Sequence, residues 1–175
     1  MSPYRTAVAR TEIERTVQPS LIDRLTDTEL GVRDDPPTTR EESARQFRLS
    51  VERDVEWLLN TRRTMHPAPA GCPELRRSAH EYALPDTTGI AVGTKVGRER
   101  LLASLRDTIA RFEPRLANPR VRLIEAAQVN APQMRFVVEA TLVMDPSSEQ
   151  VVFDTVLEIA RGEYAVLDGP APSAG

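Results

Sequence analysis

The chain contains one cysteine, Cys72, so an internal disulfide bond is impossible, which fits a reducing compartment. It also lacks any apolar run that approaches the roughly 20 residues needed for a membrane-spanning helix. The first residues, Met1 to Ser20, have neither the apolar core nor the cleavage site of a secretory signal. These absences argue against disulfide-rich, membrane-spanning and secreted proteins, and we expect a cytoplasmic protein.

A strong charge of one sign is missing as well. The chain has 23 basic and 26 acidic residues, a net charge of only −3. This balance gives no electrostatic reason to bind nucleic acid or an anionic membrane, and we expect no nucleic acid partner and no direct insertion into a membrane. All the basic residues except Lys95 are arginine. Arginine pairs well with carboxylates at interfaces, although a GC-rich genome produces the same bias.

Hydrophobic residues make up 40 % of the 175 residues, enough for the core of one domain. Apolar side chains recur at helical spacing from Glu41 to Leu59, which predicts an amphipathic helix. A second helix is predicted from Arg98 to about Glu113, because Pro114 disfavours helical geometry in the residue before it. Glu99 in its first turn and Arg111 in its last turn would both suit the helix dipole.

Two shorter segments are also candidates for helices. Leu21 to Leu25 could form a short helix or a docking peptide, with Pro19-Ser20 as its start signal. Glu74 to Tyr82 could form two helical turns, within a stretch from 64 to 97 that prolines and glycines interrupt. We therefore expect an extended arm with a short docking helix at 1–40, a folded domain at 41–168 and a disordered tail at 169–175.

After Pro119 the hydrophobic period changes to two, which predicts β-strands. Turns are expected at Asn130-Ala131-Pro132 and at 145–148, and a short fourth strand at Tyr164 to Leu167. The three apolar faces comprise Val121, Leu123, Ala127 and Val129, then Met134, Phe136, Val138, Ala140, Leu142 and Met144, then Val151, Phe153, Thr155, Leu157 and Ile159. By parity, four valines point to the opposite face: Val137, Val143, Val152 and Val156.

This order of elements predicts an α+β fold, in which N-terminal helices pack on a C-terminal antiparallel β-meander of three to four strands.

Patterns typical of catalytic or metal sites are weak in this chain. The spacing of His66, Cys72 and His80 matches no zinc motif. The glycine-rich run 89–95 lacks the Gly-Lys-Ser/Thr order of a phosphate-binding loop, and the chain has no Gly-x-Ser-x-Gly nucleophile motif. We expect no catalytic, metal-binding or cofactor-binding residues.

Several ordered motifs instead resemble a known family. They are Ser50–Arg63, Tyr82 with Leu84-Pro85-Asp86, and Phe112–Leu116, together with the N-terminal segment Pro19–Leu25. These segments are similar to TssE proteins, the type VI secretion subunits of the phage baseplate wedge family that is historically called gene-25-like lysozyme. One departure is Ala83, where the family often has glycine.

The resemblance implies a structural role in the cytoplasmic baseplate, which is recruited to the inner membrane. The expected partners are the baseplate subunits TssF, TssG and TssK, and the sheath subunits TssB and TssC. The sheet would resemble the part of a sheath subunit that exchanges strands, so that it helps to initiate sheath polymerisation. The Glu-Pro-Arg motif, here Glu113, Pro114 and Arg115, is associated in the family with contacts that hold the baseplate together.

From the residues themselves, we expect Pro114 to hold Glu113 and Arg115 in a restricted geometry that suits an interface. Alanine at either charged position should then change the melting temperature little. We also expect a partner strand to pair at one sheet edge, near Val152 or Val156.

The alternative function is a peptidoglycan-cleaving muramidase, as the historical name suggests. Glu113 would be its candidate acid, but Arg115 would favour the charged form of that carboxyl.

Overall fold

The computed structural model describes residues 16–26, 39–86, 89–124, 133–145, 147–159 and 161–168. The chain divides into two compact units, 1–47 and 48–175, with the boundary inside one long helix, and the division expected at residue 40 stays a prediction. The predicted tail at 169–175, the predicted turn at 130–132 and the apolar positions Ala127 and Val129 lie outside the described residues. Among the described helices, none is both long and apolar enough to cross a membrane.

The first unit contains helix α1, Leu21–Leu25, which confirms the predicted short helix. The Ser20 hydroxyl caps its start by accepting the N–H of Asp23 at 3.2 Å. The N–H of Val17 donates to the Ser43 hydroxyl at 3.1 Å, which ties the preceding residues to the beginning of helix α2, Arg40–Asn60. All three apolar side chains of α1 are well exposed.

The two long helices confirm the periodicity of the sequence. On α2, Val51, Val55, Leu58 and Leu59 are buried as predicted. Helix α3 spans Lys95–Phe112, so it begins earlier than the predicted Arg98. The reason is Thr94, whose side chain accepts the N–H of Gly97 and so caps the first turn. Glu99 consequently lies beyond the first turn, whereas Arg111 is in the last turn as predicted.

The predicted two-turn helix at Glu74 to Tyr82 is wrong in type. The structure has two 3₁₀ helices instead, η1 at Pro73–Arg77 and η2 at Ala79–Glu81. Ser78 separates them in extended geometry, and its hydroxyl accepts the N–H of His80. A serine that bonds locally in this way competes with continuation of the helix.

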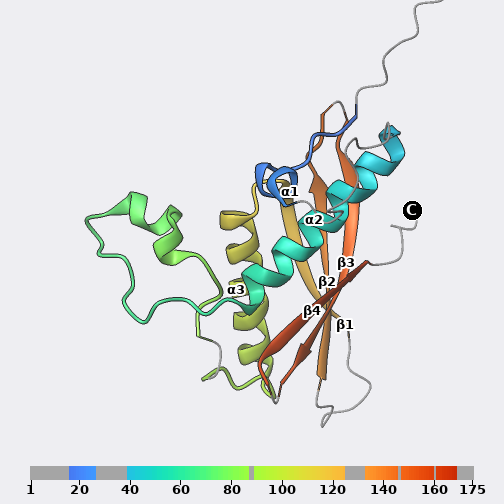
Figure 1. Ribbon diagram of the computed structural model, residues 1–175. Helices are drawn as coiled ribbons and strands as arrows, with labels where there is room; N and C mark the ends of the chain where they lie inside the picture. Colours follow the sequence, from blue (N-terminus) through green and yellow to red (C-terminus); the bar gives the residue numbers. More distant parts are fainter. Residues whose placement is uncertain are drawn as a thin grey trace, which may run out of the picture. The chain divides into compact units, whose positions relative to one another are not determined.

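The second unit contains an antiparallel sheet in the order β1-β2-β3-β4. Its strands are β1 (Leu116–Ile124), β2 (Gln133–Leu142), β3 (Glu149–Glu158) and β4 (Glu163–Asp168). Helix α3 lies against β1 (Figure 1). Side chains of α2 bond to β4. The α+β fold with a C-terminal meander is therefore confirmed.

Details of three strands differ from expectation. Strand β1 starts at Leu116, not after Pro119, because a bulge between Ala117 and Arg120 accommodates the proline within the strand. Met144 and Ile159 lie beyond the ends of β2 and β3, and Ile159 is 41 % exposed. Neither residue therefore belongs to the buried face of its strand.

The core of the second unit lies between these helices and one face of the sheet. That face alternates as predicted, so every second residue of β2 from Met134 to Leu142 and of β3 from Val151 to Leu157 is buried. Phe136, which is fully buried, meets the ring of Tyr164 edge-on, with 6.1 Å between the ring centroids. Packing of these strands against α2 and α3 fixes which sheet face remains for partners.

Thr155 is a polar residue within this core, 1 % exposed, and its hydroxyl has no hydrogen-bond partner among the described residues. A buried polar group without a partner costs about 1–3 kcal/mol. Thr155→Val, which keeps the shape and removes the hydroxyl, is expected to raise the free energy of unfolding by roughly 1 kcal/mol. Urea denaturation measures this change. Thr155→Ser, which keeps the hydroxyl and loses a methyl group, should instead destabilise the protein.

Candidate functional site

The Glu-Pro-Arg motif forms the junction between α3 and β1. The N–H of Glu113 donates to the carbonyl of Ile109 at 2.9 Å, which closes the last turn of α3. Pro114 then prevents a further turn, and the N–H of Leu116 donates to the carbonyl of Glu113 at 3.1 Å. The carbonyl of Arg115 accepts the N–H of Val143, at the end of β2, at 2.8 Å. The motif thus joins helix and sheet through its backbone.

The charged side chains of the motif bind each other. Arg115 donates from Nε to Glu113 Oε1 at 2.6 Å and from Nη2 to Glu113 Oε2 at 2.5 Å. Its Nη2 also donates to Asp54 Oδ2 on α2, at 2.7 Å. Glu113 is only 4 % exposed, and the side chains of Arg115 and Asp54 are about a fifth exposed. We call these three residues the Glu113–Arg115–Asp54 cluster.

The cluster shifts the pKa values of two side chains. The hydrogen bond between Arg115 and Glu113 raises the pKa of Arg115, so its guanidinium stays charged. Burial raises the pKa of Tyr82, with Asp54 and Glu113 raising it further, so the phenol stays neutral at physiological pH. The ring of Tyr82 in turn meets Phe112 edge-on at 5.5 Å.

Sequence reasoning identified two members of this cluster and missed Asp54. The signal was present, because Asp54 lies within the charged segment Ser50–Arg63, but nothing in the sequence pairs it with Arg115. Arg53 also contacts the cluster. Its Nη2 donates to Asp54 Oδ1 at 2.9 Å, and its guanidinium lies 4.8 Å from the ring centroid of Trp57. Trp57 is 55 % exposed.

The burial of the motif residues determines which of them a partner protein can contact. Glu113 is buried and both of its carboxylate oxygens bind Arg115, so its charge is already paired within the chain. Pro114 is exposed and Arg115 is half-buried. The expectation that alanine at Glu113 leaves stability unchanged therefore does not fit this geometry. Contact with a partner through Pro114 and the exposed part of Arg115 stays a prediction.

The second predicted site is the sheet face opposite the core. Val152 and Val156 alternate with buried residues of β3 and are half-buried, so their outward parity is confirmed. Val156 lies between Arg135 of β2 and Ala165 of β4 in the sheet register. Val156 is therefore on an interior strand, and pairing of a partner strand near it stays a prediction.

Charged side chains pair diagonally across the same outer face. Arg122 of β1 forms an ion pair with Glu139 of β2, and Arg135 of β2 lies 3.6 Å from Asp154 of β3. Valines and ion pairs thus alternate on this surface.

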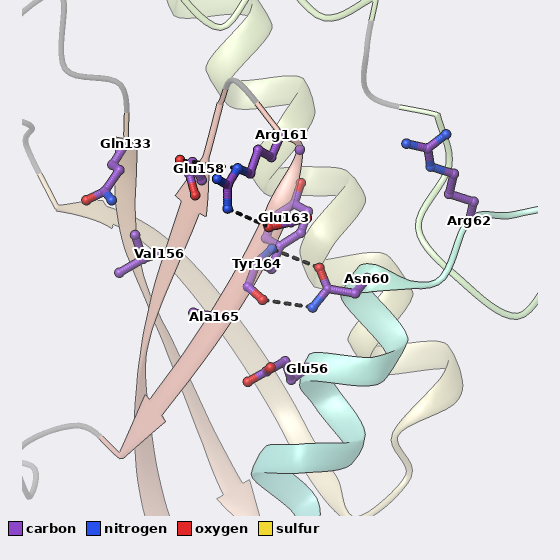
Figure 2. A pocket seen from close by; sticks show the side chains of 11 residues that line it. Glu56, Asn60, Arg62, Gln133, Val156, Glu158, Arg161, Glu163, Tyr164 and Ala165 are labelled. Atoms are coloured by element: carbon purple, nitrogen blue, oxygen red, sulfur yellow. Dashed lines mark hydrogen bonds and ion pairs between the residues drawn. The ribbon is translucent and has the colours of Figure 1, made fainter.

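The two edges of the sheet are not equivalent. The side-chain amide of Asn60 mimics a neighbouring strand at β4: its Nδ2 donates to the carbonyl of Tyr164, and its Oδ1 accepts the N–H of Tyr164, both at 2.8 Å (Figure 2). Glu56 accepts the N–H of Val166 at 3.2 Å. Outward backbone groups of β4 are therefore already bonded to α2, beside a hollow of about 640 Å³.

The outer side of β1 and the first part of β3 have no neighbouring strand in the described part of the chain. No described strand pairs with the outer side of β1. Strand β4 pairs with β3 only from Phe153 to Glu158, so Glu149 to Val152 has no described strand on that side. Val152, unlike Val156, thus borders an open stretch of the sheet. Open strand edges are the places where another chain adds a strand.

Ala83 occupies the position where the resemblance predicts glycine. Its φ of 120° lies in the region that favours glycine, and it is 1 % exposed. A non-glycine residue held there costs on the order of 1–3 kcal/mol. The departure from the family's glycine at this position therefore comes with backbone strain.

The α+β domain thus combines a buried junction cluster, an outer sheet face with ion pairs, and strand edges without a neighbouring strand in the described residues. The family model described as baseplate wedge protein gp25 matches residues 45–147. Because the match covers more than half of the chain, the protein belongs to this family of baseplate wedge proteins. Neither the search of curated proteins nor the search of solved structures found a match.

The matched segment contains the whole Glu113–Arg115–Asp54 cluster and strands β1 and β2. It ends before β3, so Val152 and Val156 lie outside it. Membership of the family therefore bears on the junction motif more directly than on the two valines.

Proposed function

We propose that the chain is a TssE-type subunit of a type VI secretion baseplate, which links the baseplate wedge to the contractile sheath and helps to initiate sheath polymerisation. The family match supports the baseplate role. The observation that carries the sheath role is the inequality of the sheet edges. Side chains of α2 occupy the edge of β4, whereas β1 has no described strand beside it.

In this role the protein has two kinds of partner. The baseplate subunits TssF, TssG and TssK would contact the wedge-facing parts of the domain, including Pro114 and the exposed part of Arg115. The sheath subunits TssB and TssC would add backbone pairing at an open strand edge and contact the outer face near Val152. The protein would act in the cytoplasm, at a baseplate recruited to the inner membrane.

A deletion and complementation experiment tests this role. Removing the gene from a bacterium with an active type VI system should abolish fluorescent sheath assemblies, and the wild-type gene should restore them. The tagged protein should co-purify with TssF, TssG and TssK. Normal sheath assembly in the deletion strain would contradict the proposal.

We propose that the protein is not an enzyme, in contrast to the alternative muramidase function. A glycosidase acid must hold a proton that it can donate, and a second carboxyl must flank the same bond. Glu113 is 4 % exposed and both of its carboxylate oxygens bind Arg115, so this side chain is engaged within the chain and is not presented to a polysaccharide.

Purified protein is accordingly expected to release no soluble fragments from purified peptidoglycan. Chromatography of the digest measures this, with hen lysozyme as the positive control. Cleavage by the wild type that disappears in Glu113→Gln would establish the muramidase function instead.

A further inference from the structure

The segment from Arg62 to His80 differs in charge from the rest of the chain. It contains four arginines and one glutamate, a net charge of +3, whereas the whole chain has a net charge of −3. Most of its residues are exposed, and Met65 is 94 % exposed. In Figure 1 this segment, drawn in green, projects away from α3 and from the sheet. Long connections within compact domains commonly have a function.

A buried carboxylate fixes the base of this projection. Glu81 is 3 % exposed and forms an ion pair with Arg63, and Arg111 of α3 approaches the same oxygen at 3.9 Å. The other oxygen accepts the N–H of Ala68 at 2.6 Å. Because both ends of the segment and the last turn of α3 meet at Glu81, the base is attached firmly to the domain.

Further bonds hold the two sides of the projection together. A parallel bridge joins Arg62 to Leu84, and the ring Nε2 of His80 lies 2.9 Å from the carbonyl of His66. Nearer the tip, the N–H of Cys72 donates to the carbonyl of Pro69 at 3.0 Å. The 3₁₀ helix η1 then presents Arg76 and Arg77, both exposed, in its last turn.

We propose that this projection is a preorganised docking element for an acidic surface of another baseplate protein, an inference that rests on the proposed function. Arg76 and Arg77 supply the charge, and Met65 supplies an apolar contact. Arg63 takes no part, because Glu81 already binds it. Arginine guanidinium groups match carboxylates with two parallel hydrogen bonds. The ordered base and turns reduce the conformational entropy that is lost on docking.

The charge distribution also favours one orientation of an approaching partner. Outside the projection the chain is net acidic, so an acidic partner is attracted to this segment and repelled by the remainder. An acidic protein surface is favoured over a nucleic acid or an anionic membrane because the projection carries only four arginines together with Glu74, whereas a polyanion is bound through many basic contacts.

The test compares two charge reversals in the full-length protein. Arg76→Glu/Arg77→Glu changes the projection, and Arg100→Glu/Arg106→Glu makes the same change in net charge on exposed residues of α3. Binding to purified TssF, TssG and TssK of the same bacterium is measured by biolayer interferometry at several salt concentrations. We expect the first variant to lose about tenfold or more in affinity for one subunit, and the α3 control to change by about twofold or less. Salt should weaken wild-type binding more steeply than binding of the first variant.

Each other outcome overturns the inference. An equal loss in both variants would show an effect of overall charge, and no loss in either would show that the projection does not dock. Loss of binding to vesicles of anionic phospholipid or to RNA, with unchanged affinity for all three subunits, would assign the segment to those ligands instead. If the first variant melts below the wild type, Arg76→Ser/Arg77→Ser provides the comparison. Failure of the wild type to bind any of the three subunits would overturn the proposed function as well.

Discussion

Replacing Glu113 with alanine is expected to lower the free energy of unfolding of the isolated protein by about 3 kcal/mol. Breaking a buried ion pair by removing one partner typically costs about 3–5 kcal/mol. The lower end applies, because Arg115 keeps its bond to Asp54 and has some access to solvent. Urea denaturation gives this change directly, and thermal melting should show a decrease of roughly 6–12 °C.

Glu99→Ala on helix α3, which ends directly before Glu113, is the matched control. The side chain of Glu99 is 64 % exposed and approaches Lys95 only at 4.0 Å, so its removal should change stability by about 0.5 kcal/mol or less. A double-mutant cycle of Glu113→Ala with Arg115→Ala should give a coupling energy on the order of 2 kcal/mol. If Glu113→Ala is as stable as Glu99→Ala, the cluster does not stabilise the fold.

This result decides how functional data on the motif are interpreted. Loss of secretion in Glu113→Ala would report an unstable protein and would not by itself identify a contact with a partner. Pro114 is exposed, so a partner can reach it without disturbing the buried carboxylate. A role of the motif in binding therefore has to be established with variants whose melting temperature matches that of the wild type.

The sequence predicted those parts of the fold that depend on local periodicity. Alternation along β2 and β3 identified the buried face, because each strand packs one face against the helices. The helical stripe on α2 was equally clear, since Val51, Val55 and Leu58 repeat at the spacing of a helix. The family resemblance added the junction motif, which spacing alone could not interpret.

Contacts between residues far apart in the chain could not be predicted in this way. Asp54 and Arg115 are 61 residues apart, and Asn60 and Tyr164 are 104 residues apart. Neither pair leaves a local pattern, because each depends on how helices dock against the sheet. The sequence therefore suggested exposed charges at Glu113 and Arg115 and could not decide which sheet edge is covered. Ala83 is an intermediate case: the sequence showed the departure from the family's glycine, and only the structure shows the positive φ there.

Replacing Val156 with lysine is expected to leave the protein folded while weakening its association with the sheath subunits TssB and TssC. Val156 is half-buried on the outer face; Arg135 lies opposite it in the register, but Asp154 and Glu158 of the same strand offset the added positive charge. The predicted change in unfolding free energy is therefore below about 1 kcal/mol. A partner that covers this face must desolvate the new charge, and we expect the affinity to fall about tenfold or more.

Two further substitutions on β3 make this experiment decisive about the docking surface. Leu157→Lys places the same charge on the opposite face, at a residue that is 5 % exposed, and should unfold the protein because the core cannot solvate an ammonium group. Val152→Lys lies where β4 has ended, beside the open stretch of β3, and should weaken sheath association at least as strongly as Val156→Lys. Circular dichroism measures folding, and sedimentation with assembled sheath measures association. Normal association of both valine variants would exclude the outer face and leave the edge of β1 as the place for sheath docking, whereas an effect of Val152→Lys alone would locate docking at the end of β3.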